Sequence, residues 1–307
     1  MFPRLNYLLV ILIWATTPLA IKLGGDSLAP MAGLTLRMAL AFAVGSLICT
    51  VFGLAGLNIR SHWRLYLAAS ISLFPNMVLV YQAAEYIPSG LMALMFGLNP
   101  LVTAVLAKPI LGENLLRPRK VLAIVLAVMG LLCILADDVA LPPDAALGIG
   151  LMLTSNLLFS GSALWVKRLN AQLTVEPLEQ ALGAMAFSLP GLVLTWVFVV
   201  GVEPLVISPT SLASLLYLAL VASLVGFVAY YFILKTMSVE VVSLIPFVSP
   251  ILAIVIGVLV ADESLSANIL VGAGLILSSL LLHQGKLRLS RNTASRADES
   301  VRQGGKA

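Results

Sequence analysis

The chain of 307 residues is 60% hydrophobic and only 10% charged, and its mean hydropathy is +1.06. Soluble domains carry about 25% charged residues, so a water-soluble fold could not cover such a core. The charged residues are clustered between long apolar blocks, which indicates an all-α integral membrane protein with lipid as its main solvent. The net charge of +4 gives no indication of a nucleic-acid partner.

Ten apolar stretches of membrane length follow one another along the chain, separated by polar or Pro/Gly-marked turns. They cover residues 5–22, 30–54, 65–84, 89–111, 119–136, 147–167, 178–201, 212–234, 241–261 and 268–283. The first stretch could be taken for a signal peptide, but a later segment is similar to it, and a cleaved leader would have no reason to be duplicated. We therefore expect ten transmembrane helices.

Basic residues are distributed unequally between the two sides that ten helices define. With the N-terminus inside, the inner side receives nearly all the lysines and arginines, whereas the outer side receives essentially only Lys22 and most of the acidic residues. Cytoplasmic loops are enriched in basic residues, so both termini are predicted to be cytoplasmic, in the inner (plasma) membrane of a bacterium. The polar, basic segment 286–307 is predicted to be a disordered cytoplasmic tail; binding to anionic lipid is the alternative.

The chain contains an internal repeat. A shift of 150 positions places Pro100 over Pro250 and Glu113 over Glu263. Proline and glutamate are scarce in this chain, so their joint coincidence is informative where leucine matches would not be. Two further pairs of segments agree with a small change of register: "LYLA" at 65–68 with 216–219, and "WATTPLAIK" at 14–22 with "FSGSALWVK" at 159–167.

The repeat predicts two units, 1–138 and 139–285, with five helices each. Because five is odd, the second unit enters the membrane from the opposite side, which makes the repeat inverted. Such a repeat is typical of secondary transporters, which bind their substrate near the midplane between helices interrupted at matching positions. The matching interruptions are Pro100 and Pro250, which we interpret as hinges that line the pathway; the alternative is that they serve only packing.

Four segments resemble the EamA branch of the drug/metabolite transporter superfamily: "LIWATTPLAIK", "PMAGLTLR", "NPLVTAVLAKPILGE" and "SPILAIVIGVLVADE". The resemblance spans residues 5–283, although its motifs are loose apolar patterns. It implies a ten-helix, five-plus-five inverted fold around a central pathway, with the fifth and tenth helices set aside. Many members look like exporters of amino acids and related metabolites. The ending "ADE" departs from the small-Gly-Glu pattern of the earlier copy.

Charged residues inside membrane helices are candidates for function because they are costly there. Arg37 lies roughly 10 Å along its helix from Pro30 at 1.5 Å per residue. It either extends to the interface, or forms a pair or holds a substrate carboxylate. Lys108 is expected to extend to the interface, and Glu85 is an interfacial charge or a proton site.

Amides, hydroxyls and aromatic rings complete the candidate substrate site. The amides either join helices together or face a wet pocket, and the rings either pack or form an apolar pocket suited to hydrophobic amino acids. With Arg37, the candidate substrate-binding residues are Trp14, Asn76, Tyr81, Phe96, Asn99, Asn156, Phe159, Trp165, Tyr230, Phe247 and Ser249.

We therefore expect a secondary transporter that exports hydrophobic or aromatic amino acids, or related metabolites, by alternating access. Its partners are a small-molecule substrate and membrane lipid; the sequence does not determine the oligomeric state. Other small-solute transport (of drugs, amines, sugars or nucleosides) is the alternative, followed by a channel or an intramembrane enzyme. Two separated histidines and two cysteines within apolar blocks give little material for a metal site, so no metal, cofactor or catalytic residue is expected.

Overall fold

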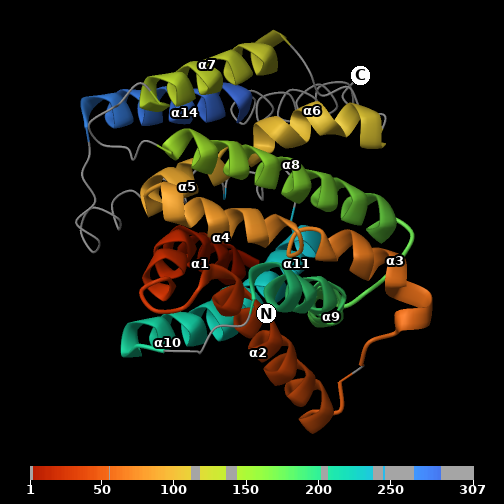
Figure 1. Cartoon of the computed structure of the whole chain (residues 1–307). Coiled ribbons are helices and arrows are strands. Elements are labelled where there is room, and N and C mark those ends of the chain that lie inside the picture. The colour runs from red at the N-terminus through yellow and green to blue at the C-terminus, as the bar shows by residue number, and fades with distance from the viewer. Residues whose placement is uncertain are drawn as a thin grey trace, which may run out of the picture.

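The computed structural model of the chain is built from helices (Figure 1). It describes residues 3–54, 56–111, 118–135, 144–201, 207–237, 245 and 266–284. The α-helices of the first half are α1 (Pro3–Gly24), α2 (Pro30–Val51), α3 (Ile59–Ser70), α4 (Asn76–Tyr86), α5 (Ser89–Phe96), α6 (Asn99–Leu111) and α7 (Pro118–Leu135). Those of the second half are α8 (Ala145–Asn170), α9 (Pro177–Leu194), α10 (Pro209–Leu216), α11 (Gly226–Thr236) and α14 (Ala267–Gln284), with π-helices η1 (Thr195–Val200) and η2 (Tyr217–Val225).

Helices occupy every predicted apolar stretch that the structure describes. The exception, 241–261, lies outside the described residues apart from Ile245. Within the described residues, five helical segments are long and apolar enough to cross a membrane. These are Pro3–Gly24, Pro30–Val51, Ala145–Asn170, Pro177–Phe198 and Pro209–Ile233. The other segments are shorter or interrupted.

Two predicted helices are not continuous. The stretch 65–84 is divided into α3 and α4 by turns at 71–75, and the stretch 89–111 is divided into α5 and α6 at residues 97–98. Pro75 is the last residue of the first break, and Pro100 comes two residues after the second. Proline lacks a backbone donor and clashes with the preceding turn, so it disfavours a continuous helix at both places. The interruption beside Pro100 was predicted, whereas the one beside Pro75 was not.

The second membrane helix of each predicted unit ends in a similar way. After α2, Gly53 adopts a φ of +61°, and after η1, Gly201 adopts a φ of +90°. Side chains other than glycine rarely adopt such angles, so glycine stops the helix at little conformational cost. The amide of Leu54 returns to the Cys49 carbonyl at 2.9 Å, which satisfies one of the free carbonyls at the α2 end.

Packing divides the helices into a central group and a peripheral pair. In the central group, α8 packs along α3, α4, α5 and α6, while α1 packs along α10, η2 and α11. Helix α2 lies against both α9 and η2. The peripheral pair is α7 and α14, which lie side by side at the top of Figure 1.

The α7–α14 pair is held at a very short separation by a glycine. A Cβ atom on Gly130 would lie 2.7 Å from the Gly272 carbonyl oxygen and 2.8 Å from Ile276 Cγ1. On its other face α7 exposes large apolar side chains such as Leu122 and Leu132, as expected of a helix that faces lipid. The close approach therefore depends on the absence of a side chain at position 130.

We expect Gly130→Ala to destabilise the protein by about 1–3 kcal/mol, because the new methyl group would force two backbones apart. The measurement is the melting temperature of the detergent-solubilised protein. Gly150→Ala is the matched control, since a Cβ on Gly150 of α8 would meet nothing within 4 Å. Equal melting temperatures for both variants would contradict the close α7–α14 contact.

Candidate functional site

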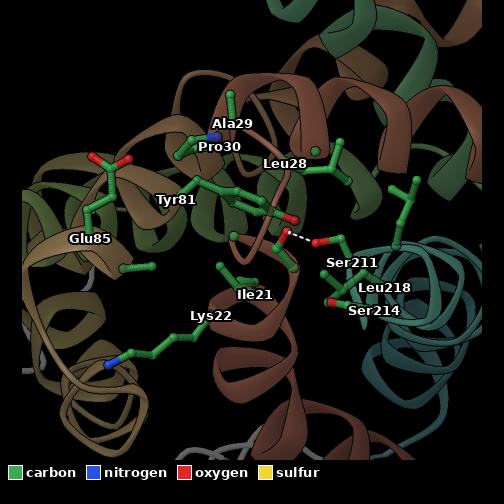
Figure 2. Close-up of a pocket in the computed structure, with 15 residues that line it drawn as sticks. Ile21, Lys22, Leu28, Ala29, Pro30, Tyr81, Glu85, Ser211, Ser214 and Leu218 are labelled. Atoms are coloured by element: carbon green, nitrogen blue, oxygen red, sulfur yellow. Dashed lines mark hydrogen bonds between the residues drawn. The ribbon is translucent and has the colours of Figure 1, made fainter. Parts of the chain in front are cut away.

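A cavity of about 160 Å³ lies among the helix ends where α1 and α4 finish and α2 and α10 begin (Figure 2). The residues that line it include Lys22, Leu28, Pro30, Gly33, Tyr81, Glu85, Ser211 and Ser214. Figure 2 shows Tyr81 reaching into the cavity toward Ser211. Both predicted halves of the chain therefore contribute to one cavity.

The cavity serines are already engaged in joining α1 to α10. The hydroxyl of Ser211 donates to the Gly24 carbonyl at 2.9 Å and accepts from the Ser27 amide at 3.1 Å. The hydroxyl of Ser214 donates to the Ala20 carbonyl. These serines therefore hold the wall together, and Lys22 and Glu85, both exposed, supply its charges.

The buried cation Arg37 lies one helical turn beyond the cavity residue Gly33, and it is only 3% exposed. Its Nε donates to Ser223 Oγ at 2.8 Å, and its Nη1 donates to the Tyr81 hydroxyl at 3.3 Å. The side chain therefore does not extend to the interface. Because Tyr81 lines the cavity, Arg37 lies just behind the cavity wall, linked to it through the Tyr81 hydroxyl.

Arg37 is not neutralised by an ion pair in the part of the chain that the structure describes, where a hydroxyl of Ser223 and one of Tyr81 are its recorded partners. Taking a charge out of water costs several kcal/mol unless partners of opposite charge compensate. A guanidinium presents five N–H donors in a planar fork that matches a carboxylate. The site is therefore suited to an anionic group arriving from the cavity.

The π-helix η2 supplies Ser223 and connects the arginine to a set of aromatic rings. Ser223 is followed at spacings of four, seven and eight by Phe227, Tyr230 and Tyr231, which places them near one face of the helix. π-Helical segments are rare and occur frequently at functional sites. Here the segment carries the hydroxyl that binds the Arg37 guanidinium.

Three predicted aromatic residues meet at the centre of the molecule. The ring centroids of Trp14 and Phe159 are 6.1 Å apart in a T-shaped contact, and Trp14 and Tyr230 are 5.0 Å apart. Tyr231 continues the cluster at 5.6 Å from Tyr230. A second cavity, lined by Phe159, Tyr230 and Tyr231 among others, holds only about 20 Å³, so the rings are closely packed.

The three predicted amides, Asn76, Asn99 and Asn156, lie where α8 packs against the two helix breaks. Ser155 Oγ donates to Asn76 Oδ1 at 2.7 Å, just after the α3–α4 break. Asn156 Nδ2 donates to the Met95 carbonyl at 2.7 Å, and Ser160 Oγ donates to the Asn99 carbonyl at 3.3 Å, on either side of the α5–α6 break. Of the two alternatives for the amides, the contacts therefore favour joining helices.

Other predicted site residues lie elsewhere or outside the described residues. Trp165 is 40% exposed, away from the aromatic cluster, and Phe96 packs against the hydrophobic core. Lys108 is exposed, as expected. Three predicted residues, Phe247, Ser249 and Pro250, lie outside the described residues.

The sequence did not indicate Ser223 or the serines of the cavity wall. A hydroxyl in an apolar helix carries no distinctive pattern, and only the spacing from Ser223 to Tyr230 could have suggested a shared face. The sequence also did not predict that His62, Tyr66 and Glu179 meet, since the histidine and the carboxylate are 117 positions apart. These residues lie away from the cavity.

A membrane-type helical fold with a partly polar cavity shared by its two halves is the arrangement expected of small-solute transporters. The comparison with known families defines the class further: the model of the EamA-like transporter family matches residues 3–136 and again residues 146–283. The chain therefore belongs to the EamA-like transporter family, and it is a membrane transporter rather than an enzyme.

Two curated bacterial proteins are similar along most of their length. Protein PecM of Dickeya dadantii (strain 3937) is 29% identical over 235 residues, which cover 75% of this chain and 76% of that protein. A probable amino-acid metabolite efflux pump of Escherichia coli (strain K12) is 25% identical over 290 residues, which cover 92% and 94%. A solved crystal structure superimposes with a TM-score of 0.66 at 19% identity, covering 92% of this chain and 96% of that one, and supports the fold.

Proposed function

We propose that this protein exports hydrophobic or aromatic amino acids, or related small carboxylates, by alternating access. The observation that carries the proposal is Arg37, a buried guanidinium behind the cavity wall that is held by two hydroxyls and has no carboxylate partner in the described residues. The relative described as a probable amino-acid metabolite efflux pump supports the same substrate class.

The proposed substrate contacts divide into a charged and an apolar part. The guanidinium of Arg37 binds the substrate carboxylate through charge-assisted hydrogen bonds, with Ser223 and Tyr81 orienting it. Phe227 and Tyr230 lie one and two turns farther along the same helix, where the aromatic cluster begins. An apolar amino-acid side chain would enter between these rings, since aromatic surfaces recognise apolar groups.

We further propose that the chain forms ten spans in two inverted units, 1–138 and 139–285, followed by the tail at 286–307. The family model's two separate matches support the duplication. Helix contacts also support it. The first helix of the first unit, α1, packs on η2 and α11 of the second unit, and the first helix of the second unit, α8, packs on the equivalent helices α3 and α4 of the first. The equivalent positions Trp14 and Phe159 touch each other, as residues on a pseudo-two-fold axis would.

Helix starts support the same correspondence. Helices α2 and α9 both begin at a proline, Pro30 and Pro177. Helices α3 and α10 both begin at a capping side chain, Asn58 and Ser208, which accepts from the amide three residues later. Equivalent elements of the two units thus share their local signals as well as their partners.

The break beside Pro100 and the equivalent position Pro250 act in this proposal as hinges on which the halves of a helix bend. The first break supports it, because Asn156 and Ser160 satisfy backbone carbonyls there without a continuous helix. The second lies outside the described residues. Both termini are proposed to be cytoplasmic, in the inner membrane, so that the cavity beside Lys22 faces outward.

The carboxylate-binding role of Arg37 can be tested with matched ligands. We expect leucine and phenylalanine to raise the melting temperature of the purified protein, whereas isoamylamine and phenethylamine, which lack the carboxylate, should not. Arg37→Gln should weaken amino-acid binding about tenfold or more, because it removes charge-assisted bonds. Arg37→Lys should recover part of it.

Arg64→Gln is the control, since Arg64 is exposed on α3. Efflux of the same amino acids from cells should fall in parallel for the Arg37 variants alone. If Arg37→Gln lost binding of amines, sugars and amino acids equally, Arg37 would have a structural role and the amino-acid assignment would fail.

The inverted arrangement predicts that positions 113 and 263, both outside the described residues, face opposite sides of the membrane. Glu113→Cys and Glu263→Cys, each introduced after replacing Cys49 and Cys133 by alanine, should react with an impermeant maleimide from the inner and the outer side, respectively. Reaction of both from one side would exclude the inversion.

The hinge at the described break predicts that Pro100→Ala slows amino-acid efflux severalfold while leaving the melting temperature nearly unchanged. Alanine restores a backbone donor and favours a continuous helix, so the bend loses its preferred position. Pro18→Ala, at a proline inside the continuous helix α1, is the control. Undiminished efflux in Pro100→Ala would remove this proline from the mechanism.

A further inference from the structure

A cluster of polar side chains joins α3 to α9 at the end of the molecule opposite the cavity. The carboxylate oxygen Glu179 Oε1 accepts from the Tyr66 hydroxyl at 2.5 Å and from His62 Nδ1 at 2.7 Å. The Tyr66 oxygen in turn accepts from the Asn58 amide at 3.1 Å. We call Asn58, His62, Tyr66 and Glu179 the latch.

The latch and the cavity lie at opposite ends of the same broken helix. His62 and Tyr66 are in the first two turns of α3, whereas Tyr81 and Glu85 are in the last turns of α4. The end of α3, the turns at 71–75 and the first turn of α4 separate Tyr66 from Tyr81. In Figure 1, α3 lies at the right of the view. Helix α10, which borders the cavity, lies at the left.

The latch is buried and charge-assisted. Tyr66 is fully buried and Glu179 is 9% exposed. Hydrogen bonds to an ionised acceptor are about twice as strong as neutral ones, and they gain further strength away from water. Among the described residues, the side chains that donate to Glu179, those of His62 and Tyr66, both come from α3.

Aromatic rings of the α3 segment also fit onto glycines of α9. A Cβ atom on Gly183 would collide with the Tyr66 ring, and one on Gly191 would collide with the Phe74 ring. Each ring therefore lies directly on the α9 backbone. The two helices are in contact from the latch as far as the α3–α4 break.

The equivalent pair of helices at the other end borders the cavity. In the proposed repeat α10 and the start of η2 correspond to α3, and α2 corresponds to α9. The cavity lies beside Gly33 of α2 and Ser214 of α10, where both helices begin, although α2 packs against η2 farther along. At the latch, by contrast, the Tyr66 ring lies directly on the α9 backbone.

We propose that the latch is the gate that closes the pathway at the end opposite the cavity, and that breaking the Glu179 bonds to α3 opens that end. This inference rests on the proposed alternating access, since it assigns the closed side of that cycle. In a rocking transporter the two ends open in alternation, so release of the latch also closes the cavity end.

The test measures accessibility at both ends without requiring a transported substrate. In a background with Cys49→Ala and Cys133→Ala, one reporter is Ala84→Cys in the large cavity. The other is Ala163→Cys in the small cavity beside the aromatic cluster, which an opening at the latch end would expose. Each is labelled with an impermeant maleimide in right-side-out and inverted vesicles. In the otherwise unchanged chain we expect fast labelling at position 84 and slow labelling at position 163.

Glu179→Gln removes the charge but keeps the shape, and Tyr66→Phe removes only one hydroxyl and leaves the ring on Gly183. We expect Glu179→Gln to accelerate labelling at position 163 by about three- to tenfold, the equivalent of weakening one or two hydrogen bonds to a charge. Labelling at position 84 should slow in the same variant. Tyr66→Phe should change both labelling rates in the same directions as Glu179→Gln, but by smaller factors.

Glu176→Gln is the matched control, because Glu176 is an exposed carboxylate next to the start of α9. The gate assignment is overturned if both reporters are unchanged in Glu179→Gln and Tyr66→Phe, or if both accelerate together, which would indicate general loosening. Loss of amino-acid binding in the Arg37 experiment would not alter these labelling rates, so the two proposals fail separately.

Discussion

The interior of this protein depends on one requirement, that backbone groups freed at broken helices find hydrogen-bond partners away from water. Helix α8 supplies them. Ser162 donates to the Ala68 carbonyl at 2.6 Å just before the first break, and Asn156 donates to the Met95 carbonyl at 2.7 Å just before the second. Each unsatisfied group would cost several kcal/mol in hydrocarbon, so the polar face of α8 is what allows broken helices at membrane depth.

That arrangement places the flexible elements next to a rigid one. Helix α8 is continuous over 26 residues, whereas the helices that border it, α3–α4 and α5–α6, are each interrupted. Movement in such a structure is most easily accommodated at the breaks, since no hydrogen bond of a regular helix has to be broken there. The cavity and the latch lie on either side of the α3–α4 break, so bending there would change both.

The sequence predicted the positions of the described helices well, because an apolar stretch of membrane length is nearly always a helix in a protein of this composition. It was less informative about continuity. Pro18 and Pro190 lie within helices that continue through them, whereas Pro75 follows a break. A proline therefore permits a break, but neighbouring hydrogen-bond partners decide whether one forms, and these come from distant parts of the chain.

The candidate site could be predicted in the same partial way. A lone arginine within an apolar helix is conspicuous, so Arg37 was identified, and the repeat aligned Trp14 with Phe159 without predicting that they touch. Their polar partners were not identified, because a serine such as Ser223 is unremarkable in sequence. Trp165 was grouped with the site by residue type, although its helix turns it outward.

The rings of Tyr66 and Phe74 are eight residues apart, and so are the two glycines that receive them, Gly183 and Gly191. A ring resting on a bare backbone meets a methyl or larger group as soon as the helix advances by one residue. Neither contact can therefore relax by itself, and sliding of one helix past the other must release both at once. Such a matched pair fixes the register of the two helices, because a shift of either one along its axis would carry both rings off their glycines.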